Sequence, residues 1–385
     1  MNERPHIQYF DGLRIIAALG VVFMHTAADR LRAGVDAEWH VLNVLTSLAF
    51  TAVPLFFMMS GYLLMTSFKT TDLSVLFRHR LPRLVIPLAG WTVVAVLWNA
   101  FRSFDLTPGG VWTRLVSSLY SPAMSHLWYM YMLIVLYLIS PILYGGIQAL
   151  SKQKYGNVFL FVLVALVSLH TMLMAVLPEA AKPYINLNLF SRLKILNGHL
   201  ATFLLGYLLG SCKKKIPNVL LALGAAATLA AIVVGTWVLT VRTGEYNQRF
   251  QYQASGYVVV LAAFIFLLFK QNYRTPPAAI KALSRPVVAL SMPIYFMHNI
   301  FLSMLNYKGI KAQSLASVLL ITLLAFAVSF IVTKTVATIK PICYIATGMT
   351  YKDACKSCNW VHTFKKLFRR GAAEEQSGPP AKPEA

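Results

Sequence analysis

The sequence predicts an all-α protein, a polytopic membrane bundle of about ten transmembrane helices. Its composition is the first reason, because 57% of the 385 residues are hydrophobic and only 12% are charged, whereas soluble domains carry about a quarter charged residues. The second reason is that apolar runs of about 20 residues, the length a helix needs to cross a bilayer, recur along nearly the whole chain. A soluble enzyme is therefore excluded, and a single bundle is favoured over several soluble domains.

Apolar runs bounded by charge, Pro or Gly define the expected spans. They lie near residues 11–29, 41–66, 84–101, 126–148, 157–177, 195–211, 217–241, 251–270, 287–305 and 312–340. We expect residues 1–340 to form the transmembrane domain and residues 341–385 to form a basic cytoplasmic tail. From about Gly371 the tail is rich in Ala, Glu, Pro, Gly and Ser, a composition typical of disorder.

The net charge of +22 is gathered in short Lys and Arg clusters between apolar runs. This placement is typical of topology signals and of contacts with anionic membrane lipids, so we expect lipids and no nucleic acid as partners. An even number of spans puts both termini on one side. The basic runs at 78–83 and 213–215 share that side, which predicts cytoplasmic termini. The four cysteines lie in or near cytoplasmic segments and imply no disulfide framework.

Ionisable residues in the first span indicate function, because they are costly in a bilayer. Arg14 and His25 are eleven residues apart, which puts them on nearly the same helix face, about 16 Å apart along the axis. Asp11 lies one turn before Arg14 and can pair with it. A neutral, buried His25 can act as a general base toward a hydroxyl, oriented by Asp29. The alternative is an interfacial ion pair, a packed histidine and a solvated Asp29.

Two further histidines fall at the depth of His25. His126 opens the fourth span, and His298 lies about eleven residues into the ninth. The three histidines can therefore converge in the outer half of the bundle, with His126, His298 and Asp11 as possible catalytic or acceptor-binding residues. The alternative is that they are satisfied core groups. None of the spacings resembles a metal motif, so no metal is predicted.

The segment from Phe77 to Arg83 has two interpretations. Its arginines can stop a span and contact lipid, or they can clamp the phosphates of a nucleotide-bearing cofactor. The Ser60-Gly61 pair in the second span predicts close helix packing. Cys355, Cys358 and His362 form only a weak metal pattern, since a fourth ligand is missing. Motifs of hydrolases, ATPases, zincins and dehydrogenases are absent.

These motifs, in this order, resemble the acyltransferase-3 family of bacterial membrane acyltransferases. The likeness covers residues of about 5–340. It runs through Tyr9-Phe10-Asp11-Gly12-Leu13-Arg14 with His25, the stretch from Phe56 to Leu64, the basic stretch from Arg78 to Arg83 followed by Ile86-Pro87, the segment from His126 to Tyr129, and the segment from Ser291 to His298.

The resemblance implies an O-acyltransferase of the bacterial inner membrane, of the O-antigen or enterobacterial-common-antigen acetylase type. It implies transfer of an acyl group, commonly acetyl from acetyl-CoA, to a hydroxyl of a cell-envelope polysaccharide or a lipid-linked sugar. Acyl-CoA is then a passing donor, and no cofactor is bound permanently. Arg14 and His25 inherit the catalytic role, and the loop arginines Arg78, Arg80 and Arg83 approximately match the family's basic loop, where the donor phosphates would dock. Two competing hypotheses are that the chain is a transporter or flippase of lipid-linked sugar, or that it is an assembly subunit of a polysaccharide exporter.

Overall fold

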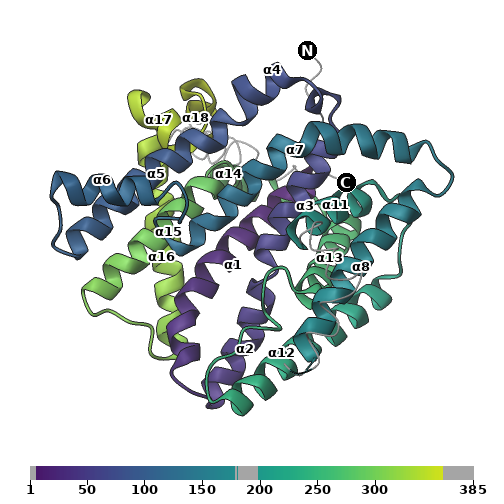
Figure 1. Ribbon diagram of the computed structural model, residues 1–385, viewed down its shortest axis with the longest axis horizontal. Helices are drawn as coiled ribbons and strands as arrows, with labels where there is room; N and C mark the ends of the chain where they lie inside the picture. The colour runs from purple at the N-terminus through teal and green to yellow at the C-terminus, as the bar shows by residue number, and fades with distance from the viewer. Residues whose placement is uncertain (1–5, 178–179, 181–197, 359–385) are drawn as a thin grey trace, which may run out of the picture.

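A computed structural model describes residues 6–177, 180 and 198–358, and the regular secondary structure of that part is entirely helical. The predicted all-α class is therefore confirmed. Figure 1 shows α1 (Gln8–Arg32) running through the middle of the bundle. The other long helices are α2 (Ala37–Ala49), α3 (Ala52–Met65), α5 (Pro82–Arg102), α7 (Trp128–Ser151), α8 (Gly156–Val176), α11 (Gly198–Ser211), α12 (Asn218–Thr243), α13 (Gly256–Asn272), α14 (Ala278–Ala289), α15 (Ser291–Tyr307) and α16 (Leu315–Ala337).

Within the described residues, 7 helical segments are long and apolar enough to cross a membrane, or up to 8 if the bent pair of α14 and α15 is one span. The chain is thus a multi-pass membrane protein, but the predicted count of ten is not confirmed. Each of the ten predicted runs does carry a helix. The shortfall arises because α11 and α13 have 14 and 17 residues, fewer than the roughly 20 that a straight crossing needs.

The second predicted span is interrupted, since α2 ends at Ala49 and α3 begins at Ala52. Pro54 explains the position of the break, because a proline ring clashes with the carbonyl four residues earlier, here that of Phe50. The freed groups are satisfied locally: the backbone N–H and the hydroxyl of Thr51 both donate to the Leu48 carbonyl, at 3.1 and 2.6 Å. Such internal pairing is what a break at membrane depth requires.

Two glycines let α3 and α11 touch backbone to backbone. A Cβ added at Gly61 would lie 1.8 Å from the carbonyl oxygen of Phe203, and one at Gly206 would lie 2.0 Å from that of Met58. Any side chain at either position would force the helices apart. The prediction of close packing at Ser60-Gly61 is confirmed, and this contact anchors the helix that lies beside α1 (Figure 1).

The folded part extends past the domain boundary predicted at residue 340. Two short helices, α17 (Lys340–Thr347) and α18 (Tyr351–Cys358), pack on α5, α14 and α16. The Trp91 indole N–H donates to the Ala346 carbonyl at 2.9 Å, and Cys343 and Cys358 are buried. The predicted tail beyond Cys358, with His362 and the basic residues of 365–370, lies outside the described residues.

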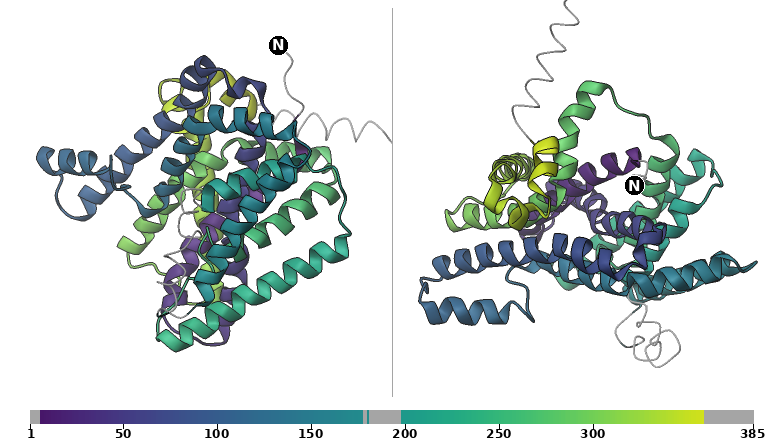
Figure 2. Two further views of the ribbon diagram at one scale, coloured as in Figure 1. Left: turned by 45° about the vertical axis from the view of Figure 1, so that its right-hand side comes forward. Right: turned by 90° about the horizontal axis from the view of Figure 1, so that it is seen from above.

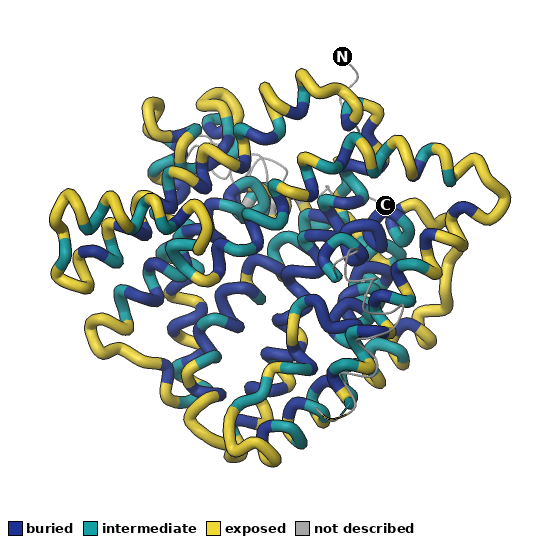
Figure 3. The backbone as a smooth tube through the Cα atoms, in the orientation of Figure 1, coloured by how far each residue is buried: buried dark blue, intermediate teal, exposed yellow. Residues whose placement is uncertain are grey.

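Burial concentrates in the middle of the molecule, along α1 and α3, while exposed positions follow the outer helices and the connections (Figure 3). Many of the outer exposed side chains are aliphatic, as expected where helices face lipid. Figure 2 shows α6 (Pro108–Ser117) beside α5 at the periphery, away from this centre. The chemistry-bearing residues of α1 therefore lie in the best-packed region.

Candidate active site

Three histidines from distant parts of the chain come together beside α1. The ring centroids of His25 and His298 are 5.3 Å apart, those of His126 and His298 are 5.0 Å apart, and those of His25 and His126 are 6.0 Å apart. His25 comes from α1, His298 from α15, and His126 from the 3-10 turn Ser125–Leu127 that leads into α7. The predicted convergence is therefore present, and we call these residues the histidine cluster.

Helix geometry on α15 positions the histidine cluster. Tyr295, one turn before His298, donates its hydroxyl proton to the His126 carbonyl, and Asn299, one residue after it, places its side-chain nitrogen 3.0 Å from Nδ1 of His126. Nδ1 of His298 faces the Ile294 carbonyl at 3.3 Å. His126 and His298 are buried, and the Nε2 atom of each has no hydrogen-bond partner.

His25 also lines a small pocket toward the C-terminal end of α1. Asp29 and Asn306 contribute its polar groups, and apolar residues of α15 and α16 such as Leu302 and Ile321 contribute the rest. Asp29 accepts a hydrogen bond from Arg32 at 3.0 Å, and both side chains are more than half exposed. Of the two interpretations of Asp29, the structure favours the solvated carboxylate over an orienter of His25.

Aromatic rings extend from the histidine cluster to the start of α7 and to α3. Tyr295 stands 5.2 Å from His126 and 5.5 Å from Tyr129, and Tyr129 stands 4.8 Å from Phe57 of α3. These are edge-on or tilted contacts at the separations that aromatic pairs prefer. A fourth histidine, His199, lies against Phe57 at 5.1 Å. These rings, which we call the aromatic wall, connect the histidine cluster to α3 and to the start of α7, whose Tyr129 interacts electrostatically with Arg14.

Arg14 lies at the other end of this wall. It interacts electrostatically with Asp11 and with the hydroxyls of Tyr129 and Tyr137. Tyr137 in turn interacts electrostatically with Arg14 and with two arginines, Arg80 and Arg83, of the segment from Phe77 to Arg83. We call this segment the basic segment. Tyr137 thus lies within electrostatic range of Arg14 and of two arginines that are far from Arg14 in sequence, Arg80 and Arg83. A positive region therefore reaches from the basic segment to α1.

The basic segment owes its shape to a π-helical turn, Leu76–Arg80, in which the Leu81 N–H bonds back to the Leu76 carbonyl at 2.9 Å. Such turns occur often at functional sites. Arg80 is half-buried and donates to the hydroxyls of Thr70 and Ser67, at 2.8 and 3.0 Å. Arg78 and Arg83 are exposed. The three predicted donor-binding arginines therefore differ: Arg80 is fixed facing inward, and Arg78 is an outer charge.

Asp11 does not form the direct ion pair predicted with Arg14. Its carboxylate lies 3.2 Å from Nε2 of His6, and Arg14 acts on it only as a nearby charge. The helical spacing allowed the pair, but the long Arg14 side chain lies near the tyrosines of α7 instead. Asp11 is also remote from the histidine cluster, four residues from the start of α1.

No group of three or more His, Cys, Asp or Glu side chains is arranged to hold a metal ion among the residues the structure describes. A histidine trio alone does not make a zinc site, since the nitrogens must point to one centre at about 2.0–2.1 Å. Each imidazole of the histidine cluster can donate and accept a hydrogen bond, which suits proton transfer.

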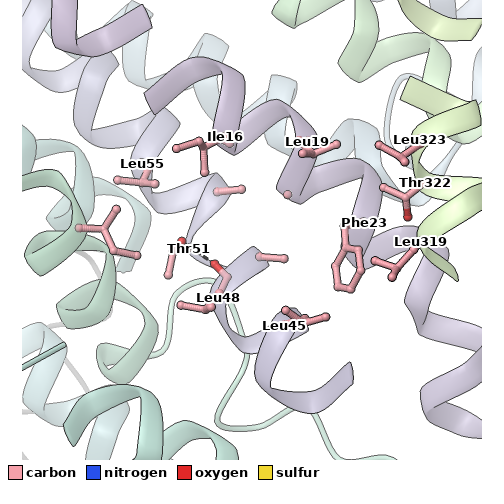
Figure 4. Close-up of a pocket in the computed structure, with 15 residues that line it drawn as sticks. Ile16, Leu19, Phe23, Leu45, Leu48, Thr51, Leu55, Leu319, Thr322 and Leu323 are labelled. Atoms are coloured by element: carbon pink, nitrogen blue, oxygen red, sulfur yellow. Dashed lines mark hydrogen bonds between the residues drawn. The ribbon is translucent and has the colours of Figure 1, made fainter. Parts of the chain in front are cut away.

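A second cavity, of about 570 Å³, lies on the opposite side of α1 (Figure 4). Aliphatic and aromatic side chains surround it, among them Ile16, Phe23, Leu48 and Leu319. Its two labelled hydroxyls already donate to carbonyls of their own segments: Thr51 to Leu48, and Thr322 to Val318 at 2.7 Å. No titratable group lines this apolar cavity, so its walls supply no acid or base.

Sequence reasoning missed the tyrosines and the amide of the site. Tyr129 and Tyr137 could have been identified from the sequence, because a tyrosine in an apolar span must find a partner for its hydroxyl. Tyr295 and Asn299 flank His298, one turn before it and one residue after it, where either could be expected to fix a histidine. Their pairing with His126, which is 169 and 173 positions away, had no local signal.

The fold and the site together define a multi-pass membrane protein with a buried histidine cluster and a positive region at the start of its central helix. The sequence profile of the acyltransferase-3 family, described as an acyltransferase domain, matches residues 7–334. The chain therefore belongs to that family and is an acyltransferase. No curated protein matches the chain, and no solved structure does.

Proposed function

We propose that this acyltransferase moves an acetyl group from acetyl-CoA to a hydroxyl of a cell-envelope polysaccharide or a lipid-linked sugar. The observation that carries the proposal is the placement of a histidine base and an arginine-rich region at two ends of one helix, joined by an aromatic wall. In this proposal the chain lies in the bacterial inner membrane, with the basic segment and both termini on the cytoplasmic side.

The donor is proposed to bind at the basic segment. Coenzyme A carries a diphosphate and a ribose phosphate, and guanidinium groups bind phosphate oxygens in a bidentate manner. Arg80 is pre-organised by Thr70 and Ser67, so it loses little side-chain freedom on binding. Arg83 and Arg14 add positive charge around Tyr137. The thioester, at the end of the extended pantetheine arm, would then reach along α1 toward the histidine cluster.

The chemical step is proposed to use His25 as the general base. An unprotonated ring nitrogen of His25 takes the proton of the acceptor hydroxyl while the oxygen attacks the thioester carbonyl. The tetrahedral intermediate then expels the thiolate of coenzyme A, and His25 returns the proton to it. The products are the O-acetyl ester and free coenzyme A. A variant of this route acylates His25 first and transfers the group in a second displacement.

Purified protein in nanodiscs tests the proposal. It is expected to release coenzyme A from acetyl-CoA only when an acceptor glycan or lipid-linked sugar is present, and mass spectrometry should find the acetyl group on the acceptor. Radiolabelled acetyl-CoA separates the two routes, because only the second leaves label on the protein. Movement of the lipid-linked sugar across the membrane without any acetylation would contradict the proposal and favour a flippase.

A further inference from the structure

The ring nitrogens of His298 are not equivalent. Nδ1 lies 3.3 Å from the Ile294 carbonyl oxygen, one turn back on the same helix. A carbonyl oxygen can only accept a hydrogen bond, so Nδ1 of His298 must carry the proton. In a neutral imidazole the other nitrogen is then a lone pair. Nε2 of His298 is therefore an acceptor fixed by the backbone of α15.

No hydrogen-bond donor is paired with this acceptor nitrogen in the structure. The His298 side chain is fully buried, and its Nε2 has no hydrogen-bond partner. Buried polar atoms without partners are rare and costly, and each one asks for an explanation. Three rings face His298: His126 at 5.0 Å, His25 at 5.3 Å and Tyr295 at 5.9 Å. Tyr295 already donates to the His126 carbonyl, so the two histidines are the available donors. Asn299 donates to Nδ1 of His126, so the N–H on Nε2 of a neutral His126 is the alternative donor to that of His25.

His25, as a base, needs a hydrogen-bond acceptor for its protonated ring nitrogen. A histidine that takes a proton on one nitrogen must keep the other nitrogen protonated, and an acceptor normally holds that N–H in place, as a carboxylate does in a catalytic triad. The nearest carboxylate on α1, that of Asp29, faces Arg32. His25 therefore lacks a carboxylate orienter within the described part of its helix.

The separation of the two rings suits a direct bond. A ring nitrogen lies roughly 1 Å from the ring centre, so two imidazoles joined in line by an N–H···N bond of about 2.9 Å have centroids about 5 Å apart. The His25 and His298 centroids are 5.3 Å apart with ring planes at 43°. A direct bond requires a ring N–H of His25 to point toward Nε2 of His298, and the centroid separation leaves room for one N–H···N bond.

We propose that Nε2 of His298 accepts the ring N–H of His25, and so holds His25 with its other nitrogen unprotonated and facing the acceptor hydroxyl. The inference rests on the proposed function, in which His25 is the base. His298 is a positioning residue, because it acts on His25 and not on the substrate. When His25 takes the proton of the hydroxyl, its second N–H stays bonded to His298, and the proton then leaves with the thiolate of coenzyme A.

Two conservative variants separate this role from a structural one. In His298→Asn the amide nitrogen reproduces Nδ1 and its bond to Ile294, but no atom reaches the place of Nε2. In His298→Gln the amide oxygen reaches that place and can accept the N–H of His25. We expect kcat to fall about 10- to 100-fold in His298→Asn and less than about tenfold in His298→Gln, with the KM for acetyl-CoA unchanged in both.

A matched control is His170→Gln, a buried histidine of α8, for which wild-type kcat is expected. Nitrogen-15 NMR of the wild-type protein in nanodiscs gives a readout without variants: His298 should carry its proton on Nδ1. A proton on Nε2 of His298 overturns the inference. So does His298→Asn with wild-type kcat, or His298→Gln no better than His298→Asn.

Failure of the proposed function looks different. A wild-type protein that transfers no acyl group, or a fully active His25→Ala, overturns the proposed function itself. An active wild type and an inactive His25→Ala, together with a fully active His298→Asn, overturn only the role given to His298.

Discussion

Two buried clusters of polar side chains in this molecule differ in how completely their polar atoms are hydrogen-bonded. The first joins α2 to the connection between α12 and α13. Gln251 donates to Oδ1 of Asn43 at 2.9 Å and to the Ser47 hydroxyl at 2.8 Å, and it accepts from the Tyr246 hydroxyl. The side-chain nitrogen of Asn43 donates to the Val233 carbonyl at 2.9 Å. We call these residues the amide network.

The second is the histidine cluster, where His126 and His298 each leave Nε2 without a partner. Asn43, Ser47, Gln251 and His298 are all fully buried, so exposure does not explain the difference. A saturated network stabilises one arrangement of the chain, whereas an unsaturated one costs stability and persists where function requires it. The amide network is therefore structural, and the histidine cluster is where chemistry is expected.

The largest expected effect follows from removing His25, the base in the proposed function. His25→Ala should lower kcat about 10²- to 10⁴-fold, because general base catalysis is lost. Thermal stability should fall little, since no hydrogen bond of a saturated network is broken. The measurement is acetyl transfer in nanodiscs alongside a melting curve. Phe23→Ala is the matched control: Phe23 lies two residues earlier on α1, facing the apolar cavity, and this variant should keep near wild-type kcat.

Substitutions in the amide network should lower stability and leave activity unchanged. Gln251→Leu leaves the Asn43, Ser47 and Tyr246 groups without their partner, which should cost about 1–3 kcal/mol of stability with normal activity per folded molecule. The double variant with Asn43→Leu should be less destabilised than the sum of the two single variants, because it removes both partners of one bond. Denaturation in detergent measures both. A stable but inactive Gln251→Leu would contradict the division between the two clusters.

A smaller effect is expected at the basic segment. Arg80→Ala should raise the KM for acetyl-CoA about tenfold with kcat little changed, because a charge-assisted bond to phosphate is lost. Arg78→Ala should have a weaker effect that vanishes at high salt, since Arg78 is exposed. Steady-state kinetics at two salt concentrations make the comparison. Equal effects of both variants would mean that the segment acts only through its overall charge.

The smallest effect concerns the turn between α1 and α2. The Trp39 backbone N–H, bonded to Asp36 at 2.8 Å, lowers the pKa of the Asp36 carboxyl from its ordinary value of 3.8, and Arg30 adds to this. The stabilisation is thus present above pH 3.8 and is lost as the pH falls through the lowered pKa.

Asp36→Asn keeps the helix cap but removes the charge, so its melting temperature should fall slightly below wild type at pH 7 and converge with it in acid. Asp36→Ala also loses the cap and should melt lower than Asp36→Asn. A gap between wild type and Asp36→Asn that stays constant down to pH 3 would show that the charge contributes nothing.

Local rules predicted much of this protein. Apolar run length placed a helix in each of the ten predicted runs, and helical periodicity put Arg14 and His25 on nearly the same face of α1. It did not locate α6, α17 or α18. The residue types alone marked His25, His126 and His298. The count of ten spans is not confirmed, because hydropathy does not report how long each helix is, and α11 and α13 are short.

By itself, the sequence determined the membrane class and the positions of the membrane helices. It also determined which ionisable residues lie in apolar spans, where their cost in free energy indicates a function. Only the tertiary structure decided their partners. It turned Arg14 toward Tyr137, and it brought three histidines into one cluster. The physical reason is that helical spacing restricts pairs within one helix, whereas contacts across 100 residues or more depend on how helices pack, which no local pattern encodes.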